Sequence, residues 1–259
     1  MYRIGLKLWS TNTGPLADAA ARLFEEGVFA YIELFAVPGS SETLPAWTRL
    51  HADYGIPFVI HNAHTAQGFN LAKRELEPRN REIAAEARAF ADALGADRII
   101  FHGGTDGDVG ETVRQLKALD EPRALIENKP FLPLPNAAGV KFCRGATADE
   151  LNRIIEGTGC GFCLDVGHAV CSANAQGLEP YAFVAELARR FRPAMFHLSD
   201  VTDMSSPYDA HPHLGTGELD IDRLRREVFP ADAAISVETV KDSKTDLEDF
   251  RRDVQWLLR

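Results

Sequence analysis

Cysteine and long apolar runs are scarce in this sequence of 259 residues. Its four cysteines are too few, in a chain of this size, to indicate a disulfide framework. No apolar run approaches the ~18 residues that a membrane-spanning helix needs. Residues 1–10 also lack the long apolar run and the small-residue cleavage site of a signal peptide. We therefore expect a cytoplasmic protein with no membrane partner.

Positive charge is also in short supply. Lys and Arg number 28 against 38 Asp and Glu, which gives a formal net charge of −10. Such a chain does not bind nucleic acid through its net charge, so any such contact needs a local patch or a bound metal. Hydrophobic residues make up 45% and charged residues 25%, as in average soluble globular proteins. This composition excludes a disordered chain, a collagen and a coiled coil.

A glycine-rich phosphate loop is missing after the first expected strand. Residues 9–18 contain no G-x-G-x-x-G, the first turn that is typical of doubly wound sheets. Instead, short apolar runs alternate with amphipathic stretches from end to end, which predicts a parallel sheet covered by helices. Eight such runs in 259 residues favour an α/β fold, a (β/α)₈ TIM barrel that forms a single domain over residues 1–259.

The expected elements can be placed along the chain. The strands are expected at residues 3–9, 30–35, 58–61, 98–102, 124–127, 162–165, 194–198 and 234–238, and helical apolar spacing covers residues 16–26, 79–94, 148–156 and 181–190. Pro15 and Pro180 fit first-turn positions, and Gly27 and Gly95 fit C-terminal caps. Residues 128–145 and 201–217 are predicted to be long loops at the C-terminal ends of strands, the face that carries the active site in TIM barrels.

Polar residues that can bind metals gather at the strand ends. Six of them lie at or near the last position of a strand: His61, His102, Glu127, Asp165, His197 and Glu238. His168 lies just beyond the sixth strand, and Asp209 and His211 form a D-x-H pair in the loop after the seventh strand. A lone His there is usually a hydrogen-bonded structural residue, and a lone Asp or Glu often caps the next helix. A closed barrel, however, directs all its strand ends to one mouth, so we expect the nine side chains to converge.

Such a convergence indicates bound cations. Four clustered carboxylates repel each other, and divalent ions would compensate their charge. Histidine and carboxylate ligands without thiolate suit zinc, with manganese or iron(II) as alternatives. Because a tetrahedral zinc site takes about four ligands, nine candidates predict two or three ions. Asp165 and His168 span a strand end and the expected loop after it, so they are expected to serve neighbouring ions.

Other polar residues are weaker candidates. The pair Cys160 and Cys163 matches C-x-x-C but runs into a strand without a second pair, which favours a structural role. Glu33 lies in the second strand and is either a support for a ligand or structural.

Three further histidines lie outside the set of nine. His64 and His213 lie beside expected ligands and are candidates for substrate contact. His51 falls in a helical stretch and is expected on the surface.

The order of the nine residues resembles that of the family 2 AP endonucleases, the endonuclease IV type, within the xylose-isomerase-like TIM barrels. Four segments carry the resemblance: FNLA at residues 69–72, CLDVGHA at 163–169, FHLSD at 196–200 and DAHPHLGTG at 209–217. The resemblance covers nearly the whole chain and implies a three-zinc site. By resemblance, the first ion is held by His61, His102 and Glu127, the second by Glu127, Asp165, His197 and Glu238, and the third by His168, Asp209 and His211.

The chain departs from that family at residues which face DNA. His64 stands where the family has a Tyr, and residues 36–47 contain no Lys or Arg. The resemblance extends in part to ketose epimerases and sugar isomerases, which hold one metal with residues matching Glu127, Asp165, His197 and Glu238 and also keep a His matching His168. In those enzymes the two glutamates shuttle a proton. A single-metal isomerase does not need His61, His102, Asp209 or His211.

Three hypotheses follow for the function. The first is a metal-dependent phosphoester hydrolase in which Glu127 or Glu238 orients the nucleophile, with abasic DNA or a phosphorylated small molecule as substrate. The second is a sugar isomerase or epimerase in which Glu127 and Glu238 act as acid and base. The third is a barrel without catalytic activity that binds a metal or a phosphorylated ligand.

Overall fold

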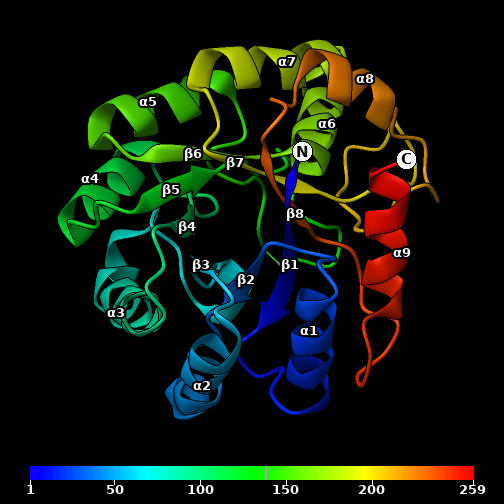
Figure 1. The fold of residues 1–259 in the computed structure, drawn as a ribbon. Helices are drawn as coiled ribbons and strands as arrows, with labels where there is room; N and C mark the ends of the chain where they lie inside the picture. Colours follow the sequence, from blue (N-terminus) through cyan, green and yellow to red (C-terminus); the bar gives the residue numbers. More distant parts are fainter. Residues whose placement is uncertain (138) are drawn as a thin grey trace.

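A closed barrel of parallel strands forms the centre of the protein (Figure 1). The computed structural model describes residues 1–137 and 139–259. Each strand pairs with the next, and the last pairs with the first: β1 (Arg3–Trp9), β2 (Tyr31–Phe35), β3 (Phe58–His61), β4 (Ile99–His102), β5 (Ala124–Glu127), β6 (Gly161–Asp165), β7 (Met195–Leu198) and β8 (Ala234–Val237). The predicted TIM barrel is confirmed.

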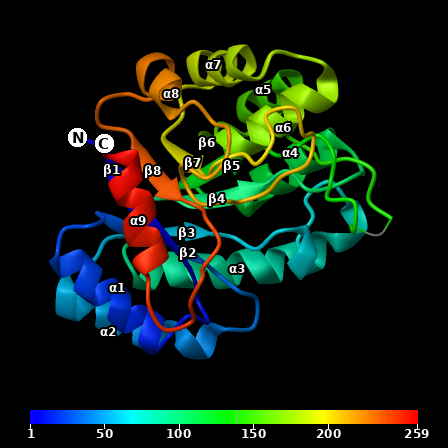
Figure 2. The ribbon, with the colours of Figure 1, turned by 90° about the vertical axis from the view of Figure 1, so that its right-hand side faces the viewer.

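Helices surround the barrel and cover its outer face (Figures 1 and 2). They are α1 (Pro15–Glu25), α2 (Leu44–Tyr54), α3 (Glu77–Ala93), α4 (Val109–Leu119), α5 (Ala148–Thr158), α6 (Val166–Gln176), α7 (Pro180–Phe191), α8 (Ile221–Glu227) and α9 (Glu248–Leu257), with 3₁₀ turns at Ser41–Thr43, Thr65–Gln67 and Arg74–Leu76. The last helix lies beside the first, where Arg251 Nη1 is 2.6 Å from Glu26 Oε2. The helical ring is thereby closed as well as the barrel.

The predicted strand bounds agree with the structure to within one residue. Pro15 and Pro180 begin α1 and α7, and Gly27 and Gly95 adopt positive φ angles of +72° and +61° just after helix ends, as expected. The four predicted helical stretches correspond to α1, α3, α5 and α7. The other helices were not individually predicted.

The segment after β6 corrects one expectation. Predicted as a loop, it is α6, which begins at Val166 directly after the strand. Asp165 is the N-cap, and its Oδ1 accepts a hydrogen bond from the His168 backbone N–H at 2.7 Å. A capping carboxylate satisfies an otherwise unpaired N–H of the first helical turn, so the helix can begin directly after the strand.

Two layers of side chains fill the barrel. The lower layer is mostly apolar and consists of Tyr31, Val59, Ile100, Leu125, Cys163, Met195 and Ala234. Two residues further along each strand, the next inward positions hold Glu33, His61, His102, Glu127, Asp165, His197 and Ser236. Because side chains alternate between the two faces of a strand, the shift of two residues stacks a polar layer on an apolar floor.

Gly5 makes room for the largest residue of that floor. A Cβ at this position would overlap the phenol ring of Tyr31. The ring fills the barrel beside β1, and its hydroxyl lies 3.0 Å from Ser236 Oγ. The apolar floor therefore depends on the missing side chain of Gly5.

A buried carboxylate, that of Asp200, holds the two ends of the loop after β7 together. Asp200 Oδ2 accepts hydrogen bonds from the backbone N–H groups of Gly215 (2.8 Å) and Gly217 (3.0 Å), and Oδ1 accepts from those of Val201 (2.8 Å) and Leu219 (3.0 Å). These contacts fix the path of the loop that carries the D-x-H pair.

His213 lies in the same loop but faces away from the barrel mouth. Its Nδ1 is 2.9 Å from Asp253 and its Nε2 is 3.1 Å from Asp242. The expectation that His213 contacts substrate is therefore wrong: its imidazole fastens the loop to the region of α9.

The loop after β5 was predicted. Residues 128–137 and 139–145 form no helix or strand, in agreement with the prediction, while residue 138 lies outside the described residues.

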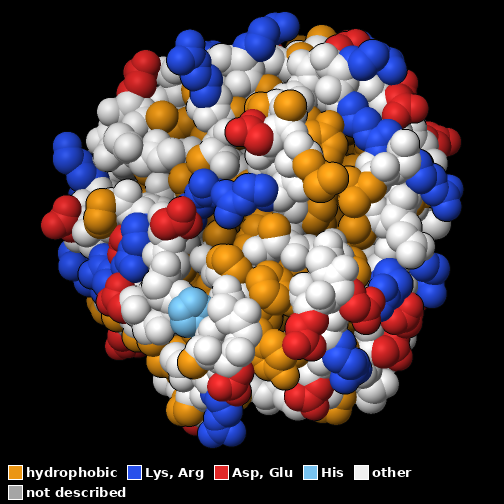
Figure 3. Space-filling model, viewed as in Figure 1, with side chains coloured by type: hydrophobic (Ala, Val, Ile, Leu, Met, Phe, Trp, Pro, Cys, Tyr) orange, Lys and Arg blue, Asp and Glu red, His pale blue; other side chains and the backbone are white. Residues whose placement is uncertain are grey.

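None of the helices placed in residues 1–137 and 139–259 is long and apolar enough to cross a membrane. On the face shown in Figure 3, acidic and basic side chains are interspersed.

We predict that Gly5→Ala lowers the free energy of unfolding by about 2 kcal/mol, because overpacking a filled core forces side chains from their preferred positions. Urea denaturation measures the loss. In a Tyr31→Ala background the same substitution should cost much less, since the ring is absent. An equal cost in both backgrounds would contradict the steric explanation.

We also predict that Asp200→Asn costs about 2–3 kcal/mol, because an amide NH₂ would face backbone N–H donors in place of an acceptor. Asp203→Asn is the matched control on the same loop, since Asp203 is exposed and, within residues 1–137 and 139–259, its carboxylate accepts only from Ser205. Its cost should stay within about 0.5 kcal/mol. Similar costs for the two variants would show that Asp200 does not anchor the loop.

Candidate metal centre

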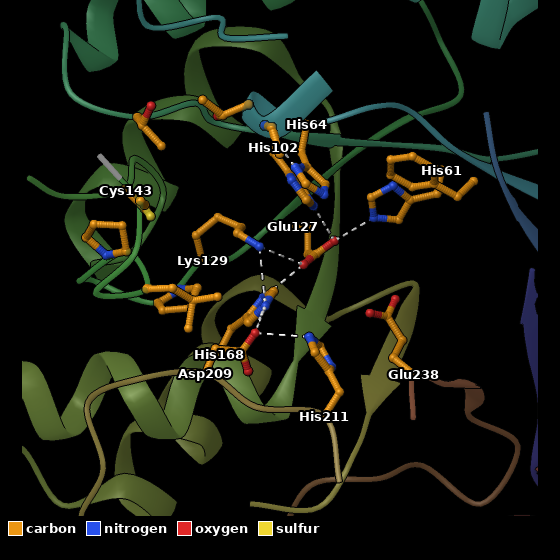
Figure 4. Close-up of a pocket in the computed structure, with 18 of the residues that line it drawn as sticks. His61, His64, His102, Glu127, Lys129, Cys143, His168, Asp209, His211 and Glu238 are labelled. Atoms are coloured by element: carbon orange, nitrogen blue, oxygen red, sulfur yellow. Dashed lines mark hydrogen bonds and ion pairs between the residues drawn. The ribbon is translucent and has the colours of Figure 1, made fainter. Parts of the chain in front are cut away.

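All nine predicted residues converge at the C-terminal mouth of the barrel, around the carboxylate of Glu127. Figure 4 labels all of them except Asp165 and His197. Glu127 Oε2 lies 3.0 Å from His61 Nε2 and 2.8 Å from His102 Nε2. Its other oxygen, Oε1, lies 2.9 Å from His168 Nδ1. Figure 4 shows His61 and His102 on one side of Glu127 and His168 with Asp209 and His211 on the other. Glu127 thus joins ligands that come from opposite sides of the mouth.

The first cluster consists of His61, His102 and Glu127, whose ligand atoms lie within 4.8 Å of one another. All three side chains are buried. Burial lowers the pKa of His102 well below its ordinary value, against the opposing effect of Glu127. The neutral imidazole that results is the form that binds a metal.

The second cluster surrounds His197. Its Nδ1 lies 2.9 Å from Glu238, 3.4 Å from Glu127 and 3.9 Å from Asp165. This nitrogen forms no hydrogen bond in the described residues, although it is buried. A buried ring nitrogen without a hydrogen-bond partner, facing three carboxylates, fits the role of a metal ligand.

The third cluster comes from α6 and the D-x-H loop. Asp209 Oδ2 lies 3.2 Å from His168 Nε2 and 3.0 Å from His211 Nε2. Among the described residues, Asp209 Oδ1 is also buried and without a hydrogen-bond partner. Asp165 and His168, three residues apart, therefore fall in neighbouring clusters, and their service to neighbouring ions stays a prediction.

Outer contacts orient three of the histidines. His61 Nδ1 donates to the backbone oxygen of Asn62 at 2.8 Å, and His168 Nδ1 donates to that of Asn128 at 2.9 Å. His197 Nε2 donates to Glu33 Oε2 at 3.0 Å. Because a carbonyl or carboxylate only accepts, each contact places a proton on the outer nitrogen and leaves the inner nitrogen free as a ligand. Glu33 is therefore a support for His197.

The field at the mouth favours cations. Burial would lower the pKa of His168, but Asp165 and then Asp209 outweigh it and, against Lys129, raise the pKa to about 10. Burial would raise the pKa of Glu127, whereas His102, His197 and Lys129 hold it well below its ordinary value. The ligand atoms belong to imidazoles and carboxylates. Some of these atoms have no hydrogen-bond partner among the described residues, and three of the histidines are oriented by outer contacts. The site therefore fits divalent ions such as zinc.

Two lysines at the mouth were not identified from the sequence. Lys7 contacts Glu33 and Glu238, and Lys129 Nζ lies 3.9 Å from Glu127 Oε1 and 3.3 Å from His168 Nε2. The sequence offered one indication, since Lys7 lies two residues after Gly5 and Lys129 two residues after Glu127. A positively charged side chain is not expected among metal ligands, so this spacing alone did not identify them.

The mouth opens into a cavity of about 820 Å³. His64 lines this cavity and packs on His102 with a ring-centroid distance of 5.5 Å, so its predicted position near substrate is retained as a prediction. His51 lies in α2, as expected, but it is half-buried rather than on the surface, and its Nδ1 is 2.8 Å from the Ile56 oxygen. Cys163 belongs to the barrel floor and Cys160 is half-buried, and both are free thiols.

Comparison with known proteins agrees with this architecture. The "Probable endonuclease 4" of Mycobacterium ulcerans is 30% identical over 208 residues, which cover 76% of this chain and 79% of that protein. The "Probable endonuclease 4" of Mycobacterium leprae is 28% identical over 258 residues, 94% of this chain and 96% of that protein.

Solved structures share the fold. The crystal structure of endonuclease IV from Thermus thermophilus superimposes with a TM-score of 0.67 at 24% identity and covers 99% of each chain. A D-tagatose 3-epimerase-like protein superimposes with a TM-score of 0.69 at 18% identity, covering 99% of this chain and 95% of the other. The family model described as "Xylose isomerase-like TIM barrel" matches residues 18–259. The chain therefore belongs to the xylose isomerase-like TIM barrel family, the family of the type 2 AP endonucleases.

Proposed function

We propose that this protein is a metal-dependent phosphoester hydrolase with a centre of up to three zinc ions. The observation that carries the proposal is the convergence of nine side chains: eight of them form three clusters, and Glu238 adjoins the second cluster, 2.9 Å from His197 Nδ1. Two of these clusters share Glu127. The third adjoins it through His168, whose Nδ1 lies 2.9 Å from Glu127 Oε1. A single-ion isomerase has no use for the clusters that contain His102 and His211. The resemblance to the endonuclease 4 proteins supports the same conclusion.

The residues of each cluster are proposed to hold one ion. His61, His102 and Glu127 would hold the first, Glu127, Asp165, His197 and Glu238 the second, and His168, Asp209 and His211 the third. Zinc ions, when bound, lower the pKa of water and neutralise charge on phosphate oxygens.

The chain contributes orientation and charge to the reaction. Glu238 is 10% exposed and lines the cavity, so its carboxylate is placed to orient a water molecule and accept its proton, with Glu127 in the same role on the buried side. Lys129 lines the cavity beside Glu127 and supplies a positive charge for a phosphate oxygen.

The mouth of the cavity suggests a phosphorylated small molecule ahead of duplex DNA. Trp9, Leu134 and Val240 line it and are about half exposed, so they offer apolar surface to an organic group. Residues 36–47 carry no basic side chain, and Trp47, the aromatic residue of that segment, is fully buried with its Nε1–H donating to the Ser10 oxygen. This segment is therefore not built to enter a duplex, and abasic DNA is the alternative substrate.

A sugar isomerase is the second candidate function. The observation in its favour is that Glu127 and Glu238 both lie within 3.4 Å of His197 Nδ1, so the two carboxylates flank one point. An acid and a base placed in this way could exchange a proton next to a carbonyl.

We predict that the purified protein binds close to three equivalents of zinc and hydrolyses bis(p-nitrophenyl) phosphate or an abasic duplex. His102→Ala should lose about one equivalent and lower kcat/KM by more than about 100-fold, because even outer-shell changes at metal sites cost 10–100-fold. Elemental analysis and initial rates measure the two effects. His51→Ala, in α2, is the matched control and should retain metal and activity.

One set of results would favour the sugar isomerase over the hydrolase. If the protein binds a single ion, converts a ketose to its epimer and keeps that activity in His102→Ala, the hydrolase assignment is refuted. Three bound ions without cleavage of either phosphodiester would instead favour a binding protein.

A further inference from the structure

Lys7 is a buried cation among the ligands of the candidate metal centre. It occupies the inward position of β1 two residues after Gly5, and its side chain is only 14% exposed. Its Nζ lies 3.1 Å from Glu33 Oε1 and donates a hydrogen bond to Glu238 Oε1. The ammonium group therefore bridges two carboxylates that come from opposite neighbours of β1, β2 and β8.

The four residues around Lys7 form a further ligand cluster, to which the three-ion scheme assigns no ion of its own. Glu33, His61, His197 and Glu238 each offer one ligand atom, and these atoms lie within 4.8 Å of one another. The ammonium of Lys7 already contacts two of the four. A divalent ion in this cluster would lie next to a fixed positive charge, and like charges at such short range repel strongly.

Glu33 holds Lys7 through a contact that does not involve Glu238. Its Oε1 faces Lys7, while its Oε2 accepts hydrogen bonds from His197 Nε2 (3.0 Å) and Ser236 Oγ (2.5 Å). If Glu238 moves to an ion, Lys7 still has a partner and remains beside the centre.

We propose that Lys7 is a built-in cation of this centre: it takes the place of a metal ion between Glu33 and Glu238, and it weakens the binding of the ion that Glu238 helps to hold. Ammonium and metal ion compete for the same carboxylate oxygen, so zinc must displace Lys7 from Glu238 before it gains that ligand. In the metal-free protein, the same ammonium compensates two buried carboxylates that would otherwise repel each other. The inference rests on the proposed zinc centre.

The test compares zinc affinities of three lysine variants by competition with a chromophoric chelator. Lys7→Met removes the charge and should tighten one class of bound zinc by at least about 10-fold. Lys7→Arg keeps the charge and should retain the wild-type affinity. Lys241→Met is the matched control: Lys241 lines the same cavity, its Nζ donates to the Thr239 oxygen, and among the described residues it lies in no ion pair with a carboxylate, so its loss should leave zinc affinity unchanged.

Thermal unfolding with and without zinc provides a second readout. Without Lys7 the apoprotein loses the cation that two carboxylates share, so Lys7→Met should have a lower Tm than the wild type without zinc and a larger rise in Tm when zinc is added. A Lys7→Met protein that binds zinc no more tightly than the wild type, or that stays unfolded when zinc is added, overturns the inference. If the wild-type protein itself binds no zinc, the proposed metal centre fails instead.

Discussion

The alternation of side chains along a closed parallel barrel is the constraint on which the rest of this structure depends. Every inward position belongs to a ring that runs through the neighbouring strands, so a shift of two residues moves a whole ring of side chains from one layer to the next. In this protein the lower ring is mostly apolar and the upper ring consists of imidazoles, carboxylates, a serine and one lysine. The apolar floor supports the polar ring and separates its charges from solvent below.

A ring of this composition is stable only if its charges are compensated. An isolated buried carboxylate is costly, and several in one layer repel each other. Lys7 and Lys129 supply part of the positive charge, and the imidazoles supply more when they are protonated. The proposed zinc ions would supply the rest, so metal binding, the charge of the lysines and the stability of the barrel are linked. The orienting contacts of Asn62, Asn128 and Glu33 direct the inner nitrogens of three histidines to that common centre.

Much of this architecture could be predicted from the order of residues. Strand ends such as Ile99–His102 and Ala124–Glu127 carry an apolar run that finishes in a polar residue, and barrel closure then requires these ends to meet. The prediction for residues 166–168 was wrong because Asp165 both ends a strand and caps a helix, and short-range signals do not separate these roles. His213 was misplaced for a related reason: a histidine two residues from the D-x-H pair can point either way, and Asp253, forty residues later, decides which.

The sequence by itself determined the barrel and the nine residues at its mouth, because periodicity and strand ends are local properties that closure converts into proximity. Only the tertiary structure decided which ring nitrogens face inward and that Lys7 lies between Glu33 and Glu238. The physical reason is that these outcomes depend on contacts between β1, β2 and β8, whose residues lie up to 231 positions apart in the chain. No local pattern reports the direction of a side chain relative to a partner at that distance.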